Sequence, residues 1–341
     1  MLATAFAGVA HYGSWASVPS FALATLALAG LAWVVSFATE QLGERFGPAV
    51  TGMMQSTLGN LPELFVVIFA LQKGELIVAQ TAIIGSIFAN AMLVLGLVIV
   101  VGARRSRDGT MRFSHRLPRD TTTLLLVTVF IIVLLGLSLA SHDPASHHVQ
   151  AISAVGAVSL LVVYIAWVVP YLRSDTGPDT GPGDAPGRPR LSLSVTLTLL
   201  LVGGVASAFV SDWFVSALSP AIDQLGLSQA FAGLVIVAIA GNAVENVAGL
   251  VLAWKGKADL AISVVKNSVA QIAAFLFPLL VLVSFLLATT LTFALAPVYI
   301  GALLVMALAM WQVTGDGEAA EFEGWALVAL YVILATLTLY E

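Results

Sequence analysis

Two stretches of the chain combine acidic, amide and hydroxyl side chains within otherwise apolar sequence. The first runs from Gly59 to Ser86 and carries Asn60 and Glu63. Carboxylate, amide and hydroxyl oxygens are the ligands that hard cations such as Ca²⁺ and Na⁺ prefer, and a carboxylate also takes up protons. The chemistry that suits these residues is therefore the reversible binding of a cation or of protons.

The second stretch repeats the first at a constant distance along the chain. It contains Gly241-Asn242, Glu245 and Ser268, and each of these residues stands 182 positions after its counterpart. Unbroken spacing over segments of this length indicates an internal duplication. We therefore expect two copies of one structural unit, each contributing half of a site.

The composition places these residues in a membrane. The chain has 341 residues, of which 59% are hydrophobic and 10% are charged, and its mean hydropathy is +1.00. Soluble domains carry about 25% charged residues, so a water-soluble globule is excluded. Apolar runs long enough to cross a hydrocarbon core of about 30 Å recur, without the alternation of a transmembrane barrel. The predicted fold class is an all-α polytopic membrane protein.

Ten spans are predicted, five on each side of a linker. Their ranges are 20–44, 49–72, 76–102, 119–141, 148–172, 191–218, 228–254, 258–287, 291–313 and 323–340. The chain then divides into four parts. These are a short N-terminal segment (1–18), a first five-helix repeat (19–172, motif 59–90), a Pro/Gly-rich linker (173–190) and a second five-helix repeat (191–341, motif 241–271).

Basic residues indicate the side of the membrane for each loop, because Lys and Arg in short loops stay cytoplasmic. Placing the six arginines of 104–119 inside puts 12 of the 14 basic residues inside, with Lys73 outside and Lys266 within a span. Both termini are then external and the linker is cytoplasmic, as in an integral protein of a bacterial-type plasma membrane. Repeats five spans apart enter the membrane in opposite directions, an arrangement typical of secondary transporters.

Both glutamates are predicted near the bilayer midplane. Each stands ten residues before the lysine that ends its span, a depth of about 15 Å at the helical rise. An ionisable group at that depth costs at least about 2.5 kcal/mol, so it normally faces a cavity or a partner. Glu63 and Glu245 are therefore the predicted cation and proton ligands. Neutral oxygens for the same site come from Asn60, Asn242, Ser86, Asn90, Ser268 and Gln271.

The surrounding residues favour an irregular backbone at the site. Pro62 removes a backbone donor beside Glu63, and Gly59 and Gly241 permit local unwinding or close helix approach. For any single Asn or Ser, hydrogen bonding between packed helices is the plainer reading. The two glutamates in matched positions are harder to explain in that way.

Three further charged residues fall within the apolar spans. Lys266 lies near the midplane and corresponds, at the offset of 182, to the apolar Ile84. We predict that it pairs with Glu245 or Glu63 and so modulates the charge of the site; the alternative is that it snorkels toward the cytoplasmic interface. Glu40 and Asp212 are predicted to line a route to the site, although each also fits an acid at a water-exposed helix end.

The motif residues resemble the calcium/cation exchanger superfamily, and most closely its cation/proton exchanger branch. The resemblance rests on Gly59-Asn60-x-x-Glu63 and Gly241-Asn242-Ala243-x-Glu245, each followed by a Lys-Gly turn, and on Gly85-Ser86-x-x-x-Asn90 and Ser268-x-x-Gln271. Thr39-Glu40 and Ser211-Asp212 also look like that branch. The similarity extends over nearly the whole chain from Pro19 onward.

The resemblance implies a ten-helix core of two inverted halves whose repeat glutamates bind cation and protons in turn. Two features depart from the branch. Asn246 stands where its second repeats have histidine, and Lys266-Asn267-Ser268 surrounds a position that is usually glycine. An ammonium group that faced the site would compete with a bound cation and favour a monovalent ion over Ca²⁺.

The leading hypothesis is an antiporter, not an enzyme, that exports Ca²⁺ or Na⁺ in exchange for protons by alternating access. The bilayer, the transported cation and protons are its expected partners; no cofactor or nucleic acid is expected, and the sequence does not specify an oligomeric state. A Na⁺/Ca²⁺ exchanger shares the duplicated glutamate plan, and a passive channel is a third reading. An intramembrane hydrolase is disfavoured because the spans lack midspan histidines and paired aspartates.

Overall fold

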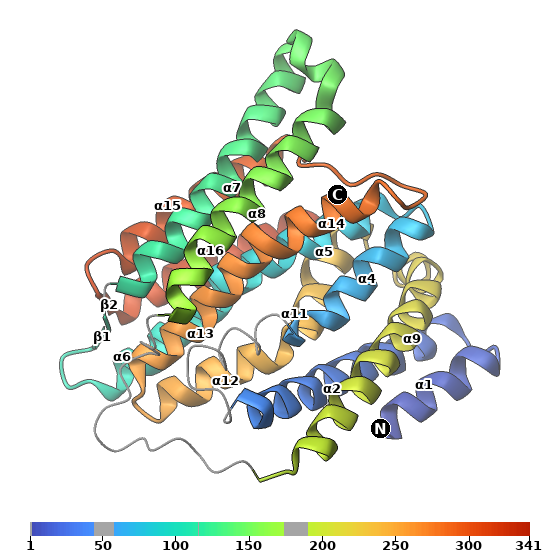
Figure 1. Ribbon diagram of the computed structural model, residues 1–341, viewed down its shortest axis with the longest axis horizontal. Coiled ribbons are helices and arrows are strands. Elements are labelled where there is room, and N and C mark those ends of the chain that lie inside the picture. Colours follow the sequence, from blue (N-terminus) through green and yellow to red (C-terminus); the bar gives the residue numbers. More distant parts are fainter. Residues whose placement is uncertain (1, 44–57, 115, 174–189) are drawn as a thin grey trace.

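A computed structural model of the chain describes residues 2–43, 58–114, 116–173 and 190–341 (Figure 1). The side chains of a few residues within helices, Glu40 and Glu245 among them, also lie outside the described part.

The first half contains helices and one short strand. In chain order they are α1 (Leu2–Tyr12), α2 (Ser17–Gly43), α4 (Leu61–Gln72), α5 (Leu76–Phe88), η1 (Ala89–Val94), α6 (Leu95–Arg105), β1 (Thr110–Arg112), α7 (Arg116–Ser141), η2 (Pro144–His148) and α8 (Val149–Arg173).

The second half follows the same plan after the linker. Its elements are α9 (Leu193–Leu225), α10 (Gln229–Phe231), η3 (Ala232–Val237), α11 (Ala238–Gly241), α12 (Ala243–Trp254), α13 (Ala258–Gln271), η4 (Ile272–Leu276), α14 (Phe277–Ser284), α15 (Pro297–Thr314), β2 (Glu318–Ala320) and α16 (Glu321–Leu339).

The predicted all-α membrane fold is confirmed. Over the described residues, eight helices are long and apolar enough to cross a membrane. A ninth span is obtained if Gln229–Gly241 and Asn246–Trp254, bent by 56° at the break between them, are counted together. Leu61–Gln72 is a shorter apolar helix, and much of the predicted span 49–72 before it lies outside the described residues.

The helices that carry Ser86 and Ser268 form the centre of the fold. In the most apolar window of Leu76–Arg105, 89% of the residues are buried, and the share is 72% for Ala258–Ser284. The corresponding share for α9 is only 22%. The two motif helices are therefore shielded by the rest of the protein, as a site at the midplane requires.

Both motif helices widen into a π-helix at matching positions. The π-helical segments η1 and η4 begin three and four residues after Ser86 and Ser268, and a third, η3, precedes Gly241. Single π-turns within α-helices occur frequently at functional sites. Apolar periodicity does not distinguish π from α geometry, so these segments were not expected from the sequence.

Helices α2 and α9 pack against each other along much of their length, away from the α7–α8 hairpin (Figure 1). They come from different halves of the chain, and each is the first long helix of its repeat. The two helices therefore make most of their contacts with each other.

The loops after α6 and α15 lie on the same side of the bundle as the end of the linker. Strand β1 pairs with β2 in antiparallel register, with Met111 opposite Ala319, and so joins the loops after α6 and α15. The backbone amide of Arg190, at the end of the linker, donates to Gln41 Oε1 at the end of α2 (2.7 Å). We call this the linker side.

A small ion-pair network reinforces the strand pairing on the linker side. Arg112 Nη2 lies 2.7 Å from Asp108 Oδ2, and Arg112 Nε lies 3.5 Å from Glu318 Oε2 on the partner strand. The guanidinium of Arg112, helped by hydrogen bonds from Ser106 and Thr110, holds the pKa of Asp108 well below its usual range. Arg112 of this loop is thus paired with an acid of its own loop and with one of the second half.

Lys73 lies on the opposite side of the bundle, in the turn between α4 and α5. The ends of α9, α14 and α16 lie there too, since Gln80 donates to the carbonyl of Ala294 and Ser228 donates to that of Thr338. The predicted separation of Lys73 from the arginine loop therefore agrees with the fold.

Two glycines let α6 and α16 pack backbone to backbone. A Cβ on Gly96 would stand 2.6 Å from the carbonyl oxygen of Gly324, and a Cβ on Gly324 would stand 2.6 Å from that of Gly96. Such small-residue contacts are a common means of helix association in membranes.

The substitution Gly324→Leu is expected to lower the free energy of unfolding by more than about 1 kcal/mol, because backbone cannot yield to the added side chain as a flexible side chain would. Thermal unfolding in detergent measures the effect. Gly301→Ala in α15 is the control, since nothing lies within 4 Å of its Cβ position. Equal melting temperatures for the two variants would contradict the close contact.

Candidate functional site

Glu63 is positioned at a break in its helix. Asn60 has a non-helical conformation (φ −83°, ψ 6°), and α4 begins directly after it with Pro62 in its first turn. The first turn of a helix favours a carboxylate because the unpaired backbone amides carry partial positive charge. Glu63 is 1% exposed, so its charge must be met inside the protein.

The second half breaks at the matching residue. Asn242 (φ −101°, ψ 16°) separates α11 from α12, and it coincides with the 56° bend described above. The predicted irregular backbone at both Gly-Asn pairs is confirmed. Breaks of this kind turn side chains and carbonyl groups toward the interior between the halves.

The two halves meet at the Glu63 carboxylate. Ser86 of α5 donates its hydroxyl to Glu63 Oε1. Asn242 of the second half donates through Nδ2 to the same Oε1 (3.3 Å) and to Ser86 Oγ (2.9 Å). A buried carboxylate is thus bound by neutral donors from both repeats.

Asn90 extends this cluster from η1. Its Nδ2 donates to the backbone carbonyl of Ser86 (3.0 Å) and to Asn242 Oδ1 (3.2 Å), and the residue is fully buried. We call Glu63, Ser86, Asn90 and Asn242 the Glu63 cluster. Four of the residues predicted from the sequence are thereby brought together.

Several predicted oxygens near the helix breaks are buried without a donor. Within the described part of the chain, Asn60 Oδ1, Asn90 Oδ1 and Ser268 Oγ have no hydrogen-bond partner. Their residues are at most 4% exposed. Buried acceptors without donors are uncommon in folded proteins and are typical of positions that hold water or a cation.

The remaining predicted ligands are less fully described. Gln271 is 2% exposed at the end of α13, and Ser268 lies one turn before it. The side chain of Glu245 lies outside the described part of the structure. Its backbone belongs to the first turn of α12, which is the position that Glu63 has in α4.

Two asparagines share this feature and were not predicted as ligands. Among the described side chains, Asn246 Oδ1 and Asn267 Oδ1 are also buried without a hydrogen-bond partner. Their counterparts at the offset of 182 are Leu64 and Gly85. Both positions were noted in the sequence as departures from the exchanger pattern, but neither was predicted to contribute an oxygen to the site.

Lys266 is held between two threonines. Its ammonium donates to Thr122 Oγ1 of α7 (3.2 Å) and to Thr314 Oγ1 at the end of α15 (2.6 Å), and the residue is 1% exposed. Helical side chains lean toward the N-terminus of their helix, which for α13 is the linker side. The side chain of Lys266 therefore extends toward the linker side, as the snorkelling alternative expects, although its ammonium stays buried. A contact with Glu245 or Glu63 remains a prediction.

The structure describes only one of the two acids that were predicted to line a route to the site. Asp212 Oδ1 forms an ion pair with Lys73 Nζ (2.7 Å) on the side opposite the linker, where both side chains are partly exposed. The side chain of Glu40 lies outside the described residues. Asp212 is thus near water and has a cationic partner that the sequence did not indicate.

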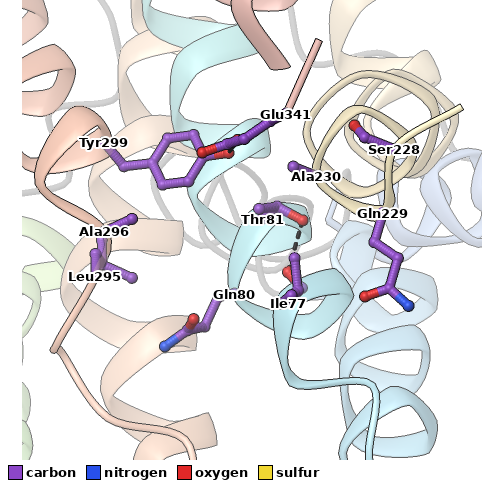
Figure 2. A pocket seen from close by; sticks show the side chains of 10 residues that line it. All are labelled: Ile77, Gln80, Thr81, Ser228, Gln229, Ala230, Leu295, Ala296, Tyr299 and Glu341. Carbon is purple, nitrogen blue, oxygen red and sulfur yellow. Dashed lines mark hydrogen bonds between the residues drawn. The ribbon is translucent and has the colours of Figure 1, made fainter. Parts of the chain in front are cut away.

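A solvent-facing cavity of about 400 Å³ lies on the side opposite the linker (Figure 2). Its wall includes Gln80 and Thr81 of α5, Gln229 of α10, Tyr299 of α15 and Glu341. Tyr299 donates its hydroxyl to Glu341. No residue of the Glu63 cluster lines this cavity, so it is separate from the predicted site.

The sequence matches the family described as sodium/calcium exchanger protein over residues 16–171 and 195–340. A vacuolar calcium ion transporter of Schizosaccharomyces pombe is 30% identical over 341 residues, covering 97% of this chain and 82% of the relative. A Ca²⁺/H⁺ antiporter of Synechocystis is 31% identical over 346 residues, covering 96% and 92%. The solved structure of native YfkE superposes with a TM-score of 0.82 at 25% identity, covering 100% of this chain and 98% of that one.

Because Lys266 is buried, we expect the stability of the protein to depend on the hydroxyl groups that accept its hydrogen bonds. Thr314→Val is expected to lower the free energy of unfolding by about 1–3 kcal/mol, because one hydrogen bond to a buried charged group is lost. In a Lys266→Leu background the same substitution should cost less than about 1 kcal/mol, since that hydrogen bond no longer exists. Denaturant unfolding in detergent of the four proteins measures the coupling; additive effects would contradict it.

Proposed function

The chain belongs to the sodium/calcium exchanger protein family, a family of transporters, and from this premise we propose that it is a secondary active antiporter that exports Ca²⁺ in exchange for protons. The curated relatives that support this choice are named as a calcium ion transporter and as Ca²⁺/H⁺ antiporters. Na⁺ is the second candidate cation.

The observation that carries the proposal is the Glu63 cluster. A carboxylate that is 1% exposed accepts hydrogen bonds from Ser86 in its own repeat and from Asn242 in the other. An unpaired charge inside a membrane protein is costly, so Glu63 must carry a cation, a proton or hydrogen bonds at every stage. The hydrogen bonds from Ser86 and Asn242 come from neutral donors and can be exchanged for either ion.

Exchange follows from competition for the same oxygens. In our proposal Glu63 and Glu245 bind the cation together with oxygens of Asn60, Asn90, Asn242, Ser86, Ser268 and Gln271. When the cation leaves, protons take its place on the carboxylates, so the two ions travel in opposite directions. The α2–α9 pair moving against the core would expose the site to each side in turn.

The direction of transport rests on the distribution of basic residues. We propose that the linker side, with its arginine loop, faces the cytoplasm of a plasma membrane and that both termini face outward. We also propose the division into a short N-terminal segment, two five-helix repeats and the linker between them. A proton gradient directed inward would then drive cation export.

Lys266 is proposed to modulate the preference between the two cations. When protonated, Lys266 places a positive charge at a depth similar to that predicted for the glutamates, and electrostatic interactions extend far in a low-dielectric medium. A divalent cation is repelled more strongly by this charge than a monovalent one. The hydrogen bonds to Thr122 and Thr314 fix the position of this charge.

Replacing the glutamates tests the proposed function. In proteoliposomes with an imposed pH gradient, Glu63→Gln and Glu245→Gln should each reduce Ca²⁺-dependent proton flux more than about tenfold, because a charged ligand is worth more than about 1.4 kcal/mol. Glu318→Gln in the exposed strand β2 is the control and should leave the flux unchanged. Ca²⁺ flux that needs a Na⁺ gradient instead of a pH gradient would favour a Na⁺/Ca²⁺ exchanger. Transport that survives both glutamate substitutions would sink the proposal.

Lys266→Ile restores the residue found in the first repeat and tests the modulating charge. The variant should raise the apparent affinity for Ca²⁺ by about threefold or more relative to that for Na⁺, as expected for loss of a charge interaction of about 0.7 kcal/mol or more. Competition between the two ions in the flux assay measures the ratio. An unchanged ratio in a well-folded variant would show that the ammonium is purely structural.

A further inference from the structure

The turn between α4 and α5 is fastened to α9 by one lysine. Lys73 Nζ donates to Asp212 Oδ1 (2.7 Å), to the carbonyl oxygen of Asp212 (3.1 Å) and to Ser216 Oγ (2.6 Å). Ser216 donates in turn to the carbonyl of Asp212. The ammonium thus uses all three of its protons on one face of α9, on the side opposite the linker.

A second residue of the same turn strengthens this attachment. Glu75 accepts hydrogen bonds from Ser219 of α9 (2.6 Å) and from Gln229 of α10 (3.1 Å). Figure 2 shows Gln229 at the edge of the cavity on this side. The loop between α4 and α5 therefore contacts α9 through two charged residues. The cationic Lys73 binds Asp212 and Ser216, and the anionic Glu75 binds Ser219 one helical turn further on.

The attachment lies directly beside the predicted ion site. Ser211, the residue before Asp212, donates to the carbonyl oxygen of Pro62 (3.3 Å), and Pro62 precedes Glu63. Ser211 is fully buried at this contact. If this part of α9 moved away from α4, the start of the helix that carries Glu63 would be uncovered.

Helix α1 braces the outer face of α9 at the same level. The ring of Trp213 stacks on His11 (centroids 5.8 Å apart) and makes an edge contact with Tyr12. Gly8 of α1 is so close that a Cβ there would stand 3.0 Å from the Trp213 ring. The segment around Asp212 is therefore held from both sides.

The matching turn on the linker side is fastened differently. Lys255 and Gly256 stand 182 positions after Lys73 and Gly74. Here Arg105 of α6 donates to the carbonyl of Trp254, just before the turn, and its Nε lies 3.7 Å from the Cβ position of Gly256. This contact joins two helices of the core, whereas the Lys73 contacts join the core to the α2–α9 pair.

We propose that Lys73, Asp212 and Ser216 form a latch that keeps α9 closed over Glu63 on the side opposite the linker. The inference rests on the proposed antiport by alternating access, because a latch has a function only if α9 moves. Opening on this side requires these bonds to break, so their strength sets the population of the state that is open there. Lys73 and Asp212 are then positioning residues that act on access to the ion site.

The natural sequence suits a direct test, because it contains no cysteine. Ser211→Cys places one thiol at the buried contact between α9 and Pro62, and the rate of its reaction with a water-soluble maleimide reports opening. Adding Lys73→Gln should raise that rate about two- to fivefold, the range expected for losing an exposed ion pair. Ser216→Ala removes one bond of the latch and should give a smaller rise in the same direction, which provides the test should Lys73→Gln fail to fold.

Two controls separate the latch from general loosening. Glu321→Gln breaks an ion pair of similar length, Arg104–Glu321 (2.8 Å), on the linker side, and it should leave the labelling rate unchanged. The exchange Lys73→Asp with Asp212→Lys should bring the rate back toward that of the parent. An unaltered rate in Lys73→Gln and Ser216→Ala, or an equal rise in Glu321→Gln, would overturn the latch. Labelling needs no transported ion, so the latch can fail while antiport is observed, and antiport can fail while the latch is observed.

Discussion

The fold depends on one carboxylate that has been removed from water. Glu63 is buried at the end of a broken helix, and a charge in that position requires partners on more than one side. Its own repeat supplies Ser86, and the opposite repeat supplies Asn242. Hydrogen bonds to this carboxylate thus come from both halves of the chain. The need to pair a buried charge explains why the two duplicated segments meet at this group.

The backbone around this group is shaped to bring partners close. Helices α4 and α12 begin at the two asparagines, and the π-helical turns η1 and η4 follow the two serines. A π-turn shifts the register of all later side chains by about one residue relative to an α-helix. Irregular backbone of this kind is tolerated at membrane depth only where it is buried in protein or lines a cavity. Among the described spans, the two that contain η1 and η4 are accordingly the most buried.

Duplication made the residues of the Glu63 cluster predictable from the sequence. The constant offset identified Glu63, Ser86 and Asn242 as members of one constellation, and glycine and proline placed the helix breaks. The partners of Lys266 were not predictable, because Thr122 and Thr314 lie on helices that no sequence pattern relates to α13. Asp212 was identified as a polar residue within a span, but its pairing with Lys73 depends on how α9 packs against the turn between α4 and α5. Contacts set by packing between distant helices carry no local signal.

The departure of Asn267 from Gly85 has a kinetic consequence. In the first repeat the missing side chain lets α5 approach η3 so closely that a Cβ would stand 2.5 Å from Leu234 Cα. An asparagine at the matching position does not allow an approach of that kind in the second repeat. If the chain works by alternating access, as we propose, its two passages are unequal, and we expect the barriers to opening them to differ. A carrier of that kind would turn over faster with the ion gradients in one direction than with the same gradients reversed.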